Sequence, residues 1–381
     1  MTPSTPNQAR WAVGATFLLH GILIGAWVPH IPLAKERLDV GPGMFGLALL
    51  AIAAGAVFAM PVAGALINRF GSARMTAVTG VLFCITFFGP IMAPGFASFM
   101  MAGFAMGMAI GSMDVAMNAH GIAVEKALKR PTMSMLHGGF SIGGTLGAFL
   151  GAGLLEAFGE LPQAVITAVL CLASQFAARK YYLPADVDKG LSGSHFAWPT
   201  MATIGLGLLC FLALMIEGSI LDWAAILLRE KFVLDAGIAA LGFGFYQAGM
   251  AVARLSGDWI RLRVGAVTMV AASALLAAAG TALALIAPSP ALAITAFVFA
   301  GLGLGNIAPV LFAGGGRLEP DAPGRGIAAV TTLGYTGFLC GPPLIGFLAQ
   351  VSSLNSALFL TVIAALIIAI FARSVKAADT Y

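Results

Sequence analysis

Five ionisable side chains stand inside stretches of the sequence that are otherwise apolar: Asp114, His137, Glu217, Asp222 and His20. An acid at the centre of a membrane helix costs about 2.5–3.5 kcal/mol to insert, so it usually faces a bundle interior or a water-filled cavity. Carboxylates and imidazoles in such a place can take up and release protons, or hydrogen-bond a polar ligand. They can equally hold neighbouring helices together. Spacing along the chain gives the first indication of which role each residue has.

Asp114 and His137 are predicted to meet. Asp114 lies about five residues before the end of one apolar stretch, and His137 lies about five residues after the start of the next. If the two helices are antiparallel, both side chains lie roughly 8 Å inside the same membrane boundary. Asn118 follows Asp114 by one helical turn and shares its face. We predict that Asp114 and His137 form a proton-coupling pair, and the alternative is a structural pair that locks the two helices.

Glu217 lies near the middle of a later apolar stretch and is followed by Gly218, which can loosen the helix. We predict that Glu217 binds a proton or a ligand, with an interhelical hydrogen bond as the alternative. Asp222 lies nearer to the end of that stretch, where an interfacial role competes with ligand binding. His20, in the middle of the first stretch, is either a ligand-binding or a packed core residue. The full set of candidate ligand-binding residues is Asn118, His20, Glu217, Asp222, Tyr246, Gln247, Asn306 and Tyr335.

The stretches that carry these residues are predicted membrane helices. Of the 381 residues only 9% are charged, and the mean hydropathy is +0.96, whereas a soluble domain carries about 25% charged residues. Apolar runs of roughly 20 residues, the length that a helix needs to cross a bilayer, recur about twelve times. Their length and lack of alternation exclude barrel strands. We therefore predict an all-α membrane protein with twelve transmembrane helices.

The distribution of basic residues predicts the orientation in the membrane. Four of the 20 Lys and Arg residues fall on one side, namely Lys35, Arg37, Arg229 and Lys231, and the other sixteen, Arg254 among them, fall on the side of both termini. Loops rich in Lys and Arg stay in the cytoplasm, so both termini are expected to be cytoplasmic. The net charge of +4 follows from this bias and does not indicate nucleic-acid binding.

The chain is predicted to consist of two six-helix halves. A polar stretch separates the sixth and seventh spans, and it divides the chain into an N-terminal half (1–178), a cytoplasmic linker (179–200) and a C-terminal half (201–381). Shifting the first half by 194 residues places glycine on glycine at four positions: Gly55 on Gly249, Gly71 on Gly265, Gly107 on Gly301 and Gly111 on Gly305. Two parallel repeats of six helices are the plan of many secondary transporters.

Two of the predicted helices carry residues that shape packing. The fifth has one glycine every four residues, which predicts a face for close helix contact, at Gly139, Gly143, Gly147 and Gly151. The eleventh contains Pro342 and Pro343, which are expected to bend or break it.

Two loop segments carry a family resemblance. The segment GALINRFGSAR, from Gly64 to Arg74, resembles the loop signature of the major facilitator superfamily between its second and third helices. The segment GDWIRLRVG, from Gly257 to Gly265, is similar to the degenerate copy between helices eight and nine. The resemblance implies two pseudo-symmetric six-helix halves, and a loop that stabilises one conformation through contacts between the halves. The loop residues concerned are Gly64, Asn68, Arg69, Gly71, Arg74, Asp258, Arg261 and Arg263, with Asn68 where the family usually has aspartate.

A narrower resemblance concerns the stretches 114–144 and 217–228, which are similar to a bacterial inner-membrane branch of that superfamily with distant similarity to fucose–proton symporters. It implies a secondary active transporter that moves a small polar solute, such as a sugar or related metabolite, by proton-coupled alternating access. In the superfamily plan the first, fourth, seventh and tenth helices line the cavity, which places Asp114 and Glu217 on lining helices. The partners implied are the solute, protons and the lipid bilayer, for a monomeric protein.

Other functions compete with this one. A proton-driven exporter of lipophilic compounds would have a mostly aromatic and aliphatic cavity. A membrane-embedded enzyme would use Asp114, His137 and Ser141, but no oxyanion or metal-binding group is recognisable in the sequence. A transport-dead receptor would not be expected to retain buried acids. No nucleotide-binding signature occurs, and neither a metal nor another cofactor is expected.

Overall fold

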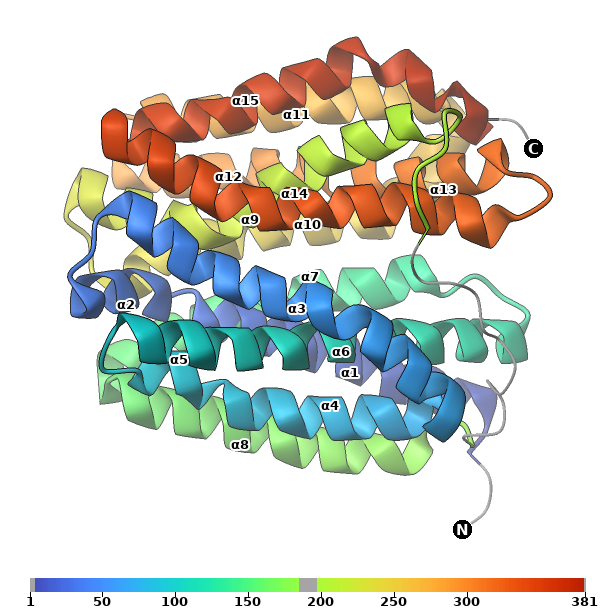
Figure 1. Ribbon diagram of the computed structural model, residues 1–381, viewed down its shortest axis with the longest axis horizontal. Helices are drawn as coiled ribbons and strands as arrows, with labels where there is room; N and C mark the ends of the chain where they lie inside the picture. The colour runs from blue at the N-terminus through green and yellow to red at the C-terminus, as the bar shows by residue number, and fades with distance from the viewer. Residues whose placement is uncertain (1–3, 185–196, 380–381) are drawn as a thin grey trace. The chain divides into compact units, whose positions relative to one another are not determined.

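The chain folds into long helices that follow the predicted apolar stretches. The computed structural model describes residues 4–184 and 197–379, so the middle of the predicted linker, with Lys189, lies outside the described residues. The helices separate into two compact units (Figure 1). The first unit comprises Met1–Asp39 with Ala51–Ser192, and the second comprises Val40–Leu50 with Gly193–Tyr381.

The first unit is a bundle in which α1 packs most closely against α7, and α4 against α6. Its helices are α1 (Pro6–Trp27), α2 (His30–Leu38), α3 (Pro42–Phe70, from Ala51 onward), α4 (Ser72–Thr86), α5 (Phe88–Met92), α6 (Phe96–Leu128), α7 (Met133–Phe158) and α8 (Glu160–Ala178), followed by the 3-10 turn Arg179–Tyr181.

The second unit has α9 packed on α14, and α12 between α10 and α11. Its helices are α9 (Ile204–Phe232), α10 (Ala236–Val264), α11 (Ala266–Ile286), α12 (Pro290–Leu304), α13 (Ile307–Leu318), α14 (Pro323–Val351) and α15 (Leu354–Ile370), followed by the 3-10 helix Ala372–Asp379. The first turns of α3 belong to this unit, where Gly43 donates its N–H to Gln350 Oε1 at 3.2 Å.

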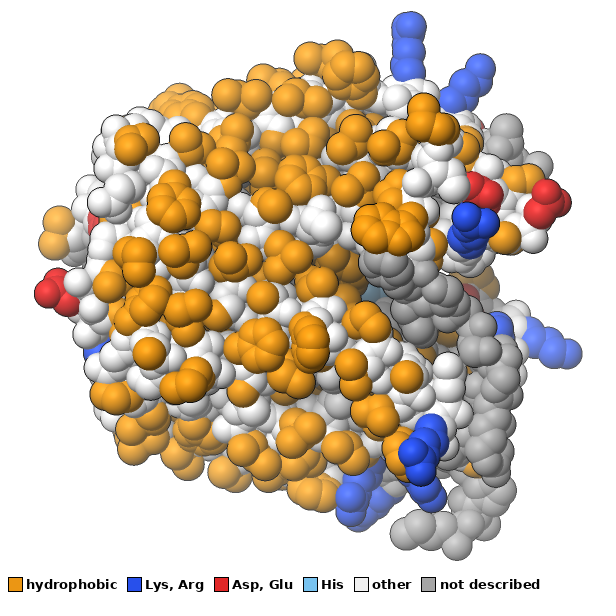
Figure 2. Space-filling view, in the orientation of Figure 1, with side chains coloured by type: hydrophobic (Ala, Val, Ile, Leu, Met, Phe, Trp, Pro, Cys, Tyr) orange, Lys and Arg blue, Asp and Glu red, His pale blue; other side chains and the backbone are white. Residues whose placement is uncertain are grey.

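The prediction of about twelve membrane helices is confirmed. Within the described residues, eleven helical segments are long and apolar enough to cross a bilayer, and Leu354–Ile370 with Ala372–Asp379 makes a twelfth when the bent pair is counted as one span. Figure 2 shows apolar side chains over the outer faces of the helices. Most of the Lys and Arg side chains visible there lie at one end of the helices within each unit.

Three details of the helices differ from the sequence prediction. The tenth span is broken at Gly305 and Asn306, where α12 ends and α13 begins. The eleventh span is not broken, because α14 is continuous through Pro342 and Pro343; the alternative, a bend at these prolines, stays a prediction. Neighbouring helices in a membrane protein tolerate the backbone groups that a proline frees. Finally, α6 continues to Leu128, about nine residues past the predicted end.

Equivalent glycines make equivalent helix contacts in the two units. At five of the six a Cβ atom would overlap a backbone carbonyl oxygen of the neighbouring helix, and at Gly305 it would meet the Ala253 side chain and lie 3.0 Å from the Met250 carbonyl oxygen, so the two backbones are in close contact. The contacts, each shifted by 194 residues between units, are Gly55 to Phe104 and Gly249 to Val298, Gly107 to Ile52 and Gly301 to Tyr246, and Gly111 to Ala56 and Gly305 to Met250. The internal repeat inferred from the sequence is therefore also a repeat of packing.

The turns after α3 and α10 repeat as well. Gly71 has φ 85° and ψ 150°, and Gly265 has φ 78° and ψ 164°. A side chain rarely adopts such a positive φ, so glycine at both positions lets one membrane helix end and the next begin without an intervening loop. These glycines belong to the two loop segments that carry the family resemblance.

The predicted glycine face of the fifth membrane helix is also confirmed. A Cβ at Gly143 or Gly147 would overlap the carbonyl oxygen of Leu18 or Ile22 in α1. In return, a Cβ at Gly21 would overlap the carbonyl oxygen of Phe140. The face holds α7 against α1, and these two helices carry the candidate residues His20 and His137.

A first prediction concerns these contacts. Gly301→Ala is expected to lower the stability of the purified protein in detergent by roughly 1–3 kcal/mol, because the added methyl group meets backbone that cannot move without separating α10 from α12. Gly107→Ala should have the same effect in the first unit. Thermal denaturation is the measurement. Gly153→Ala is the control, since nothing lies within 4 Å of the added Cβ in α7. Equal losses in all three variants would contradict the interpretation.

A second prediction concerns Val233, which follows α9 in the left-handed conformation with φ 55° and is 92% exposed. This conformation is costly for a β-branched residue, by about 1–2 kcal/mol. Val233→Gly is therefore expected to raise the melting temperature by roughly 2–4 °C. Val252→Gly, at an exposed position inside α10, should lower it. A lower melting temperature for Val233→Gly would show that its side chain makes a stabilising contact.

Candidate functional site

Asp114 lies near the middle of α6, and its carboxylate has a partner on the same helix. The Asn118 side-chain amide donates to the Asp114 backbone carbonyl at 2.8 Å and to Asp114 Oδ1 at 3.2 Å. Both residues are half-buried. The predicted shared face of Asp114 and Asn118 is thus confirmed, and the amide orients the carboxylate without neutralising it.

His20 and His137 lie on the neighbouring helices α1 and α7. His20 is buried, with Nδ1 3.4 Å from Met117 Sδ and its ring edge-on to Phe83 and Phe140. These contacts are those of a packed core histidine. His137 is half-buried, and its ring lies edge-on to Phe17 with 5.3 Å between centroids.

The predicted depth of Asp114 needs correction. Because α6 extends to Leu128, Asp114 is 14 residues, or about 21 Å, from the end of the helix, rather than roughly 8 Å. His137 is only four residues from the start of α7, at Met133. Asp114 and His137 therefore lie at different distances from the loop that joins their helices, and their pairing stays a prediction.

Glu217 forms an ion pair inside the second unit. Its Oε1 lies 3.6 Å from a guanidinium nitrogen of Arg254, and the two side chains are only 18% and 13% exposed. Glu217 is 13 residues from the start of α9 and 15 from its end, and Arg254 is 10 residues, or about 15 Å, from the end of α10. The pair therefore joins the middle of one membrane helix to the interior of the next.

Arg254 is the main site residue that sequence reasoning placed wrongly, among the basic residues at the membrane surface. The sequence prediction counted Arg254 with the loop residues on the side of the termini, whereas α10 continues past it to Val264. The signal that could have found it is the arginine's position inside an apolar stretch, which is costly without a partner.

Four buried polar atoms on the helices of this pair, α9 and α10, have no hydrogen-bond partner within the described residues. They are Tyr246 Oη, Gln247 Oε1, Ser219 Oγ and Trp223 Nε1. The Tyr246 hydroxyl interacts electrostatically with both Glu217 and Arg254. Gln247 precedes Arg254 by seven residues, which is two turns along the same face of α10. Buried polar groups are normally satisfied, so unsatisfied ones point to a ligand or to water.

The remaining candidates have mixed surroundings. Asn306 is buried and donates to the Ala253 carbonyl at 2.7 Å, so it ties the break between α12 and α13 to α10. Tyr335 stacks on Phe338 in α14, with 6.3 Å between ring centroids. Asp222 is half-buried, one residue before the fully buried Trp223.

The residues of the two loop segments lie where the helices end. In the first unit Gly64 and Gly71 are buried, Asn68 and Arg69 are exposed, and Arg74 is exposed as well.

In the second unit Asp258 and Arg263 lie near the end of α10, and the Arg263 guanidinium lies 3.7 Å from the centroid of the Trp259 ring. Arg261 donates to the carbonyl of Ala378 in the C-terminal 3-10 helix. The proposed contacts of these residues between the halves stay a prediction.

The buried residue His120, which was not among the candidates from the sequence, joins three segments of the first unit by hydrogen bonds. His120 Nε2 accepts the backbone N–H of Leu183 at 3.2 Å, and its Nδ1 lies 2.8 Å from Ser72 Oγ. Tyr182, beside it, shares a short hydrogen bond with Thr16, and burial raises the pKa of the Tyr182 phenol to about 12. This network holds the segment after α8 against the bundle.

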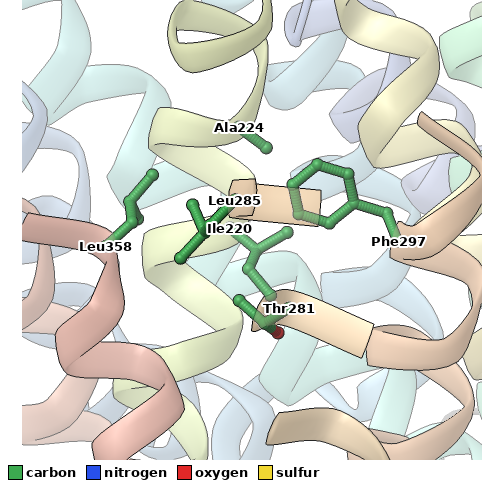
Figure 3. Close-up of a pocket in the computed structure, with 6 residues that line it drawn as sticks. All are labelled: Ile220, Ala224, Thr281, Leu285, Phe297 and Leu358. Carbon is green, nitrogen blue, oxygen red and sulfur yellow. The ribbon is translucent and has the colours of Figure 1, made fainter. Parts of the chain in front are cut away.

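An apolar gap in the second unit lies among α9, α11, α12 and α15. Figure 3 shows its lining, which consists of Ile220, Ala224, Thr281, Leu285, Phe297 and Leu358. No charged group lines it, so it is a packing defect of the bundle and separate from the Glu217–Arg254 pair.

Long membrane helices in two repeats, with an ion pair and unsatisfied polar groups inside one of them, define a multi-pass membrane transporter. The family model of the Major Facilitator Superfamily matches residues 13–317. The chain therefore belongs to the Major Facilitator Superfamily, which is a family of transporters and not of enzymes.

Relatives and solved structures agree with this assignment. The chain is 33% identical over 360 residues to an uncharacterized MFS-type transporter of Yersinia pestis, covering 94% of each chain. It is 31% identical to the membrane protein MosC of Rhizobium meliloti, covering 94% of this chain and 88% of that one. The fold is similar to that of the nucleoside transporter NupG, with a TM-score of 0.71, 13% identity and coverage of 96% and 98%. It is also similar to a bacterial homologue of the lysosomal transporter Spinster, with a TM-score of 0.73, 14% identity and coverage of 96% of both chains.

A third prediction concerns the ion pair. Glu217→Gln and Arg254→Gln should each lower the stability in detergent by roughly 3–5 kcal/mol, because each removes the ion pair of a largely buried charge. The double variant Glu217→Gln/Arg254→Gln should lose less than the sum of the two. Thermal denaturation of the four proteins gives the coupling. Strictly additive losses would show that the two charges do not stabilise each other.

Proposed function

We propose that this chain is a proton-coupled secondary transporter that moves a small polar solute, such as a sugar or related hydroxylated metabolite, by alternating access. Glu217 and Arg254 form the centre of the site. Asp114, with Asn118 and His137, forms a second protonatable group in the first unit.

The observation that carries the proposal is the ion pair between α9 and α10. An acid and an arginine inside membrane helices are costly and usually mark a pathway for solute or ions. A carboxylate that alternates between an arginine and a proton can change its net charge during a cycle, because only the carboxylate titrates. Such a group links proton uptake to a change in helix contacts.

The polar character of the solute is inferred from unpartnered polar groups on α9 and α10, the two helices of the pair. A phenol hydroxyl, an amide oxygen, a serine hydroxyl and an indole N–H lack partners among the described residues. Together they provide donors and acceptors suited to a solute rich in hydroxyl groups. NupG, which shares the fold, is a transporter of nucleosides, which also carry hydroxyl groups. The distant resemblance to fucose–proton symporters points the same way.

The location proposed is the bacterial inner membrane with both termini in the cytoplasm. The support is the excess of Lys and Arg, sixteen against four, on the side of the termini; placing Arg254 inside α10 reduces the sixteen to fifteen without changing the sign. The loop residues around Gly71 and Gly265 are proposed to stabilise one conformation of the cycle.

A fourth prediction tests this function in liposomes that enclose a pH-sensitive dye. Purified protein is presented with a panel of sugars, nucleosides and lipophilic amines. We expect one of the hydroxylated solutes to drive proton movement, and Glu217→Gln to abolish it while solute binding is retained or weakened. Asp114→Asn should reduce the coupling. Glu156→Gln, at an exposed position near the end of α7, is the matched control and should leave transport unchanged.

The other outcomes discriminate clearly. Solute uptake without proton movement, at full rate in Glu217→Gln and Asp114→Asn, would overturn proton coupling and leave a uniporter. Proton movement driven only by the lipophilic amines would overturn the polar solute and identify an exporter of lipophilic compounds.

A further inference from the structure

A second group of charged residues lies in the first unit, far along the chain from Asp114. His30, the first residue of α2, is fully buried. Its Nδ1 lies 3.3 Å from Glu160 Oε2, and its Nε2 lies 2.6 Å from Gln163 Oε1. Glu160 and Gln163 belong to the first turn of α8. The histidine ring therefore spans the gap between α2 and α8, with a polar atom at each nitrogen.

The orientation of Gln163 fixes which of these atoms donates. The Gln163 side-chain amide nitrogen donates to the Ala26 carbonyl at 3.3 Å. Its Oε1 therefore faces His30 and can only accept, so His30 Nε2 must carry a proton. A neutral imidazole with a proton on Nε2 has none on Nδ1. The Nδ1 to Glu160 contact then joins two acceptors unless a further proton lies between them.

The position of Arg37 indicates whether the proton belongs to His30 or to Glu160. A guanidinium nitrogen of Arg37 lies 3.2 Å from Glu160 Oε2 and 3.4 Å from Oε1, and another donates to the Pro90 carbonyl. A guanidinium beside a carboxylate favours its ionised form. The proton therefore belongs to His30, which becomes an imidazolium between the Glu160 carboxylate and the Gln163 oxygen. The ring of Trp27 stacks on it, with 6.2 Å between centroids, and an aromatic face favours a cation.

Within residues 4–184 and 197–379, the charged groups around His30 come from α2 and α8. The helix α8 provides Glu160, and α2 provides Arg37 together with its neighbours Lys35 and Glu36. The helix α1 ends near the ring with Trp27, and α5 begins near it, directly after Phe87, and both aromatic rings pack against His30. The proton is thus held where α1 ends, α2 begins and α8 starts.

We propose that the buried His30 and the Glu160 carboxylate, which is 35% exposed, form a proton-binding site that latches α2 to α8, separate from the site at Glu217. With the proton bound, His30 donates to both neighbours and Glu160 also accepts from Arg37. Without it, the Nδ1 contact with Glu160 is lost, and α2 is held on α8 only by the contacts of His30 with Gln163 and of Arg37 with Glu160. The pH at this helix end would then control how tightly the start of α2 is held against α8.

A fifth prediction tests the proton directly. The chain has five histidines, so 15N labelling of histidine alone gives a small set of ring signals by NMR in detergent. The signals of the His30 ring should show a proton on each of its two nitrogens. These signals should be the ones that disappear in the His30→Gln variant. A His30 ring that carries a single proton across the range from about pH 5.5 to about pH 8 would overturn the proposal.

Glu160→Gln provides a second test that does not require His30 to be replaced. The side-chain amide introduced at position 160 can donate to a neutral Nδ1, so the latch no longer needs the extra proton. We expect this variant to fold, its His30 ring to carry one proton, and its melting temperature to lose a dependence on pH that the wild type shows. In the wild type the melting temperature should fall by roughly 2–4 °C between about pH 5.5 and about pH 8. Glu156→Gln should keep the wild-type dependence. An unchanged dependence in Glu160→Gln would overturn the latch.

Discussion

Every charge inside the helices of this protein has to be matched within the protein itself, because the hydrocarbon interior of a bilayer offers no water. With only 9% charged residues, the few that lie inside helices stand out, and their partners determine what they can do. Glu217 is matched by Arg254 across two helices, whereas Asp114 is matched in part by the Asn118 amide on its own helix. The Glu217–Arg254 pair can break when α9 and α10 move apart. The Asp114–Asn118 hydrogen bond lies within one helix and is kept when helices move.

Close backbone contact makes these matches possible. Glycines bring α3 and α6 together in the first unit and α10 and α12 in the second, at positions related by one constant shift along the chain. The same α10 carries Gly301's partner Tyr246 and, two turns later, Arg254. The close contact with α12 and the ion pair with α9 thus both lie on α10. A displacement of α9 against α10 would therefore change the Glu217–Arg254 distance and leave the contact between α10 and α12 in place.

Much of the fold could be predicted from the sequence, because hydropathy and glycine spacing directly reflect the two strongest constraints on membrane helices, namely burial in lipid and close backbone packing. The repeat, the twelve spans and the glycine face of α7 could all be recognised in that way. The residues of the candidate site were harder to predict from the sequence. Arg254 and His30 lie near the ends of apolar runs, where a sequence gives no sharp boundary, and α6 and α10 extend beyond those runs. A residue that lies in a loop by hydropathy can then lie inside a helix, and a pairing such as His30 with Glu160, 130 residues apart, leaves no trace in local pattern.

The Glu217–Arg254 pair and the His30–Glu160 pair differ in whether they need a proton. Glu217 faces a permanent cation, so its pairing needs no proton, and uptake of a proton can only weaken it. His30 faces two acceptors, so its pairing needs a proton, and loss of the proton can only weaken it. The two proposals together therefore predict that the first pair loosens when protons are abundant and the second when they are scarce. Under the proposed function, such opposed responses in two units of one chain would make different helix contacts favourable at high and at low pH, and a proton-driven cycle needs contacts that change in this way.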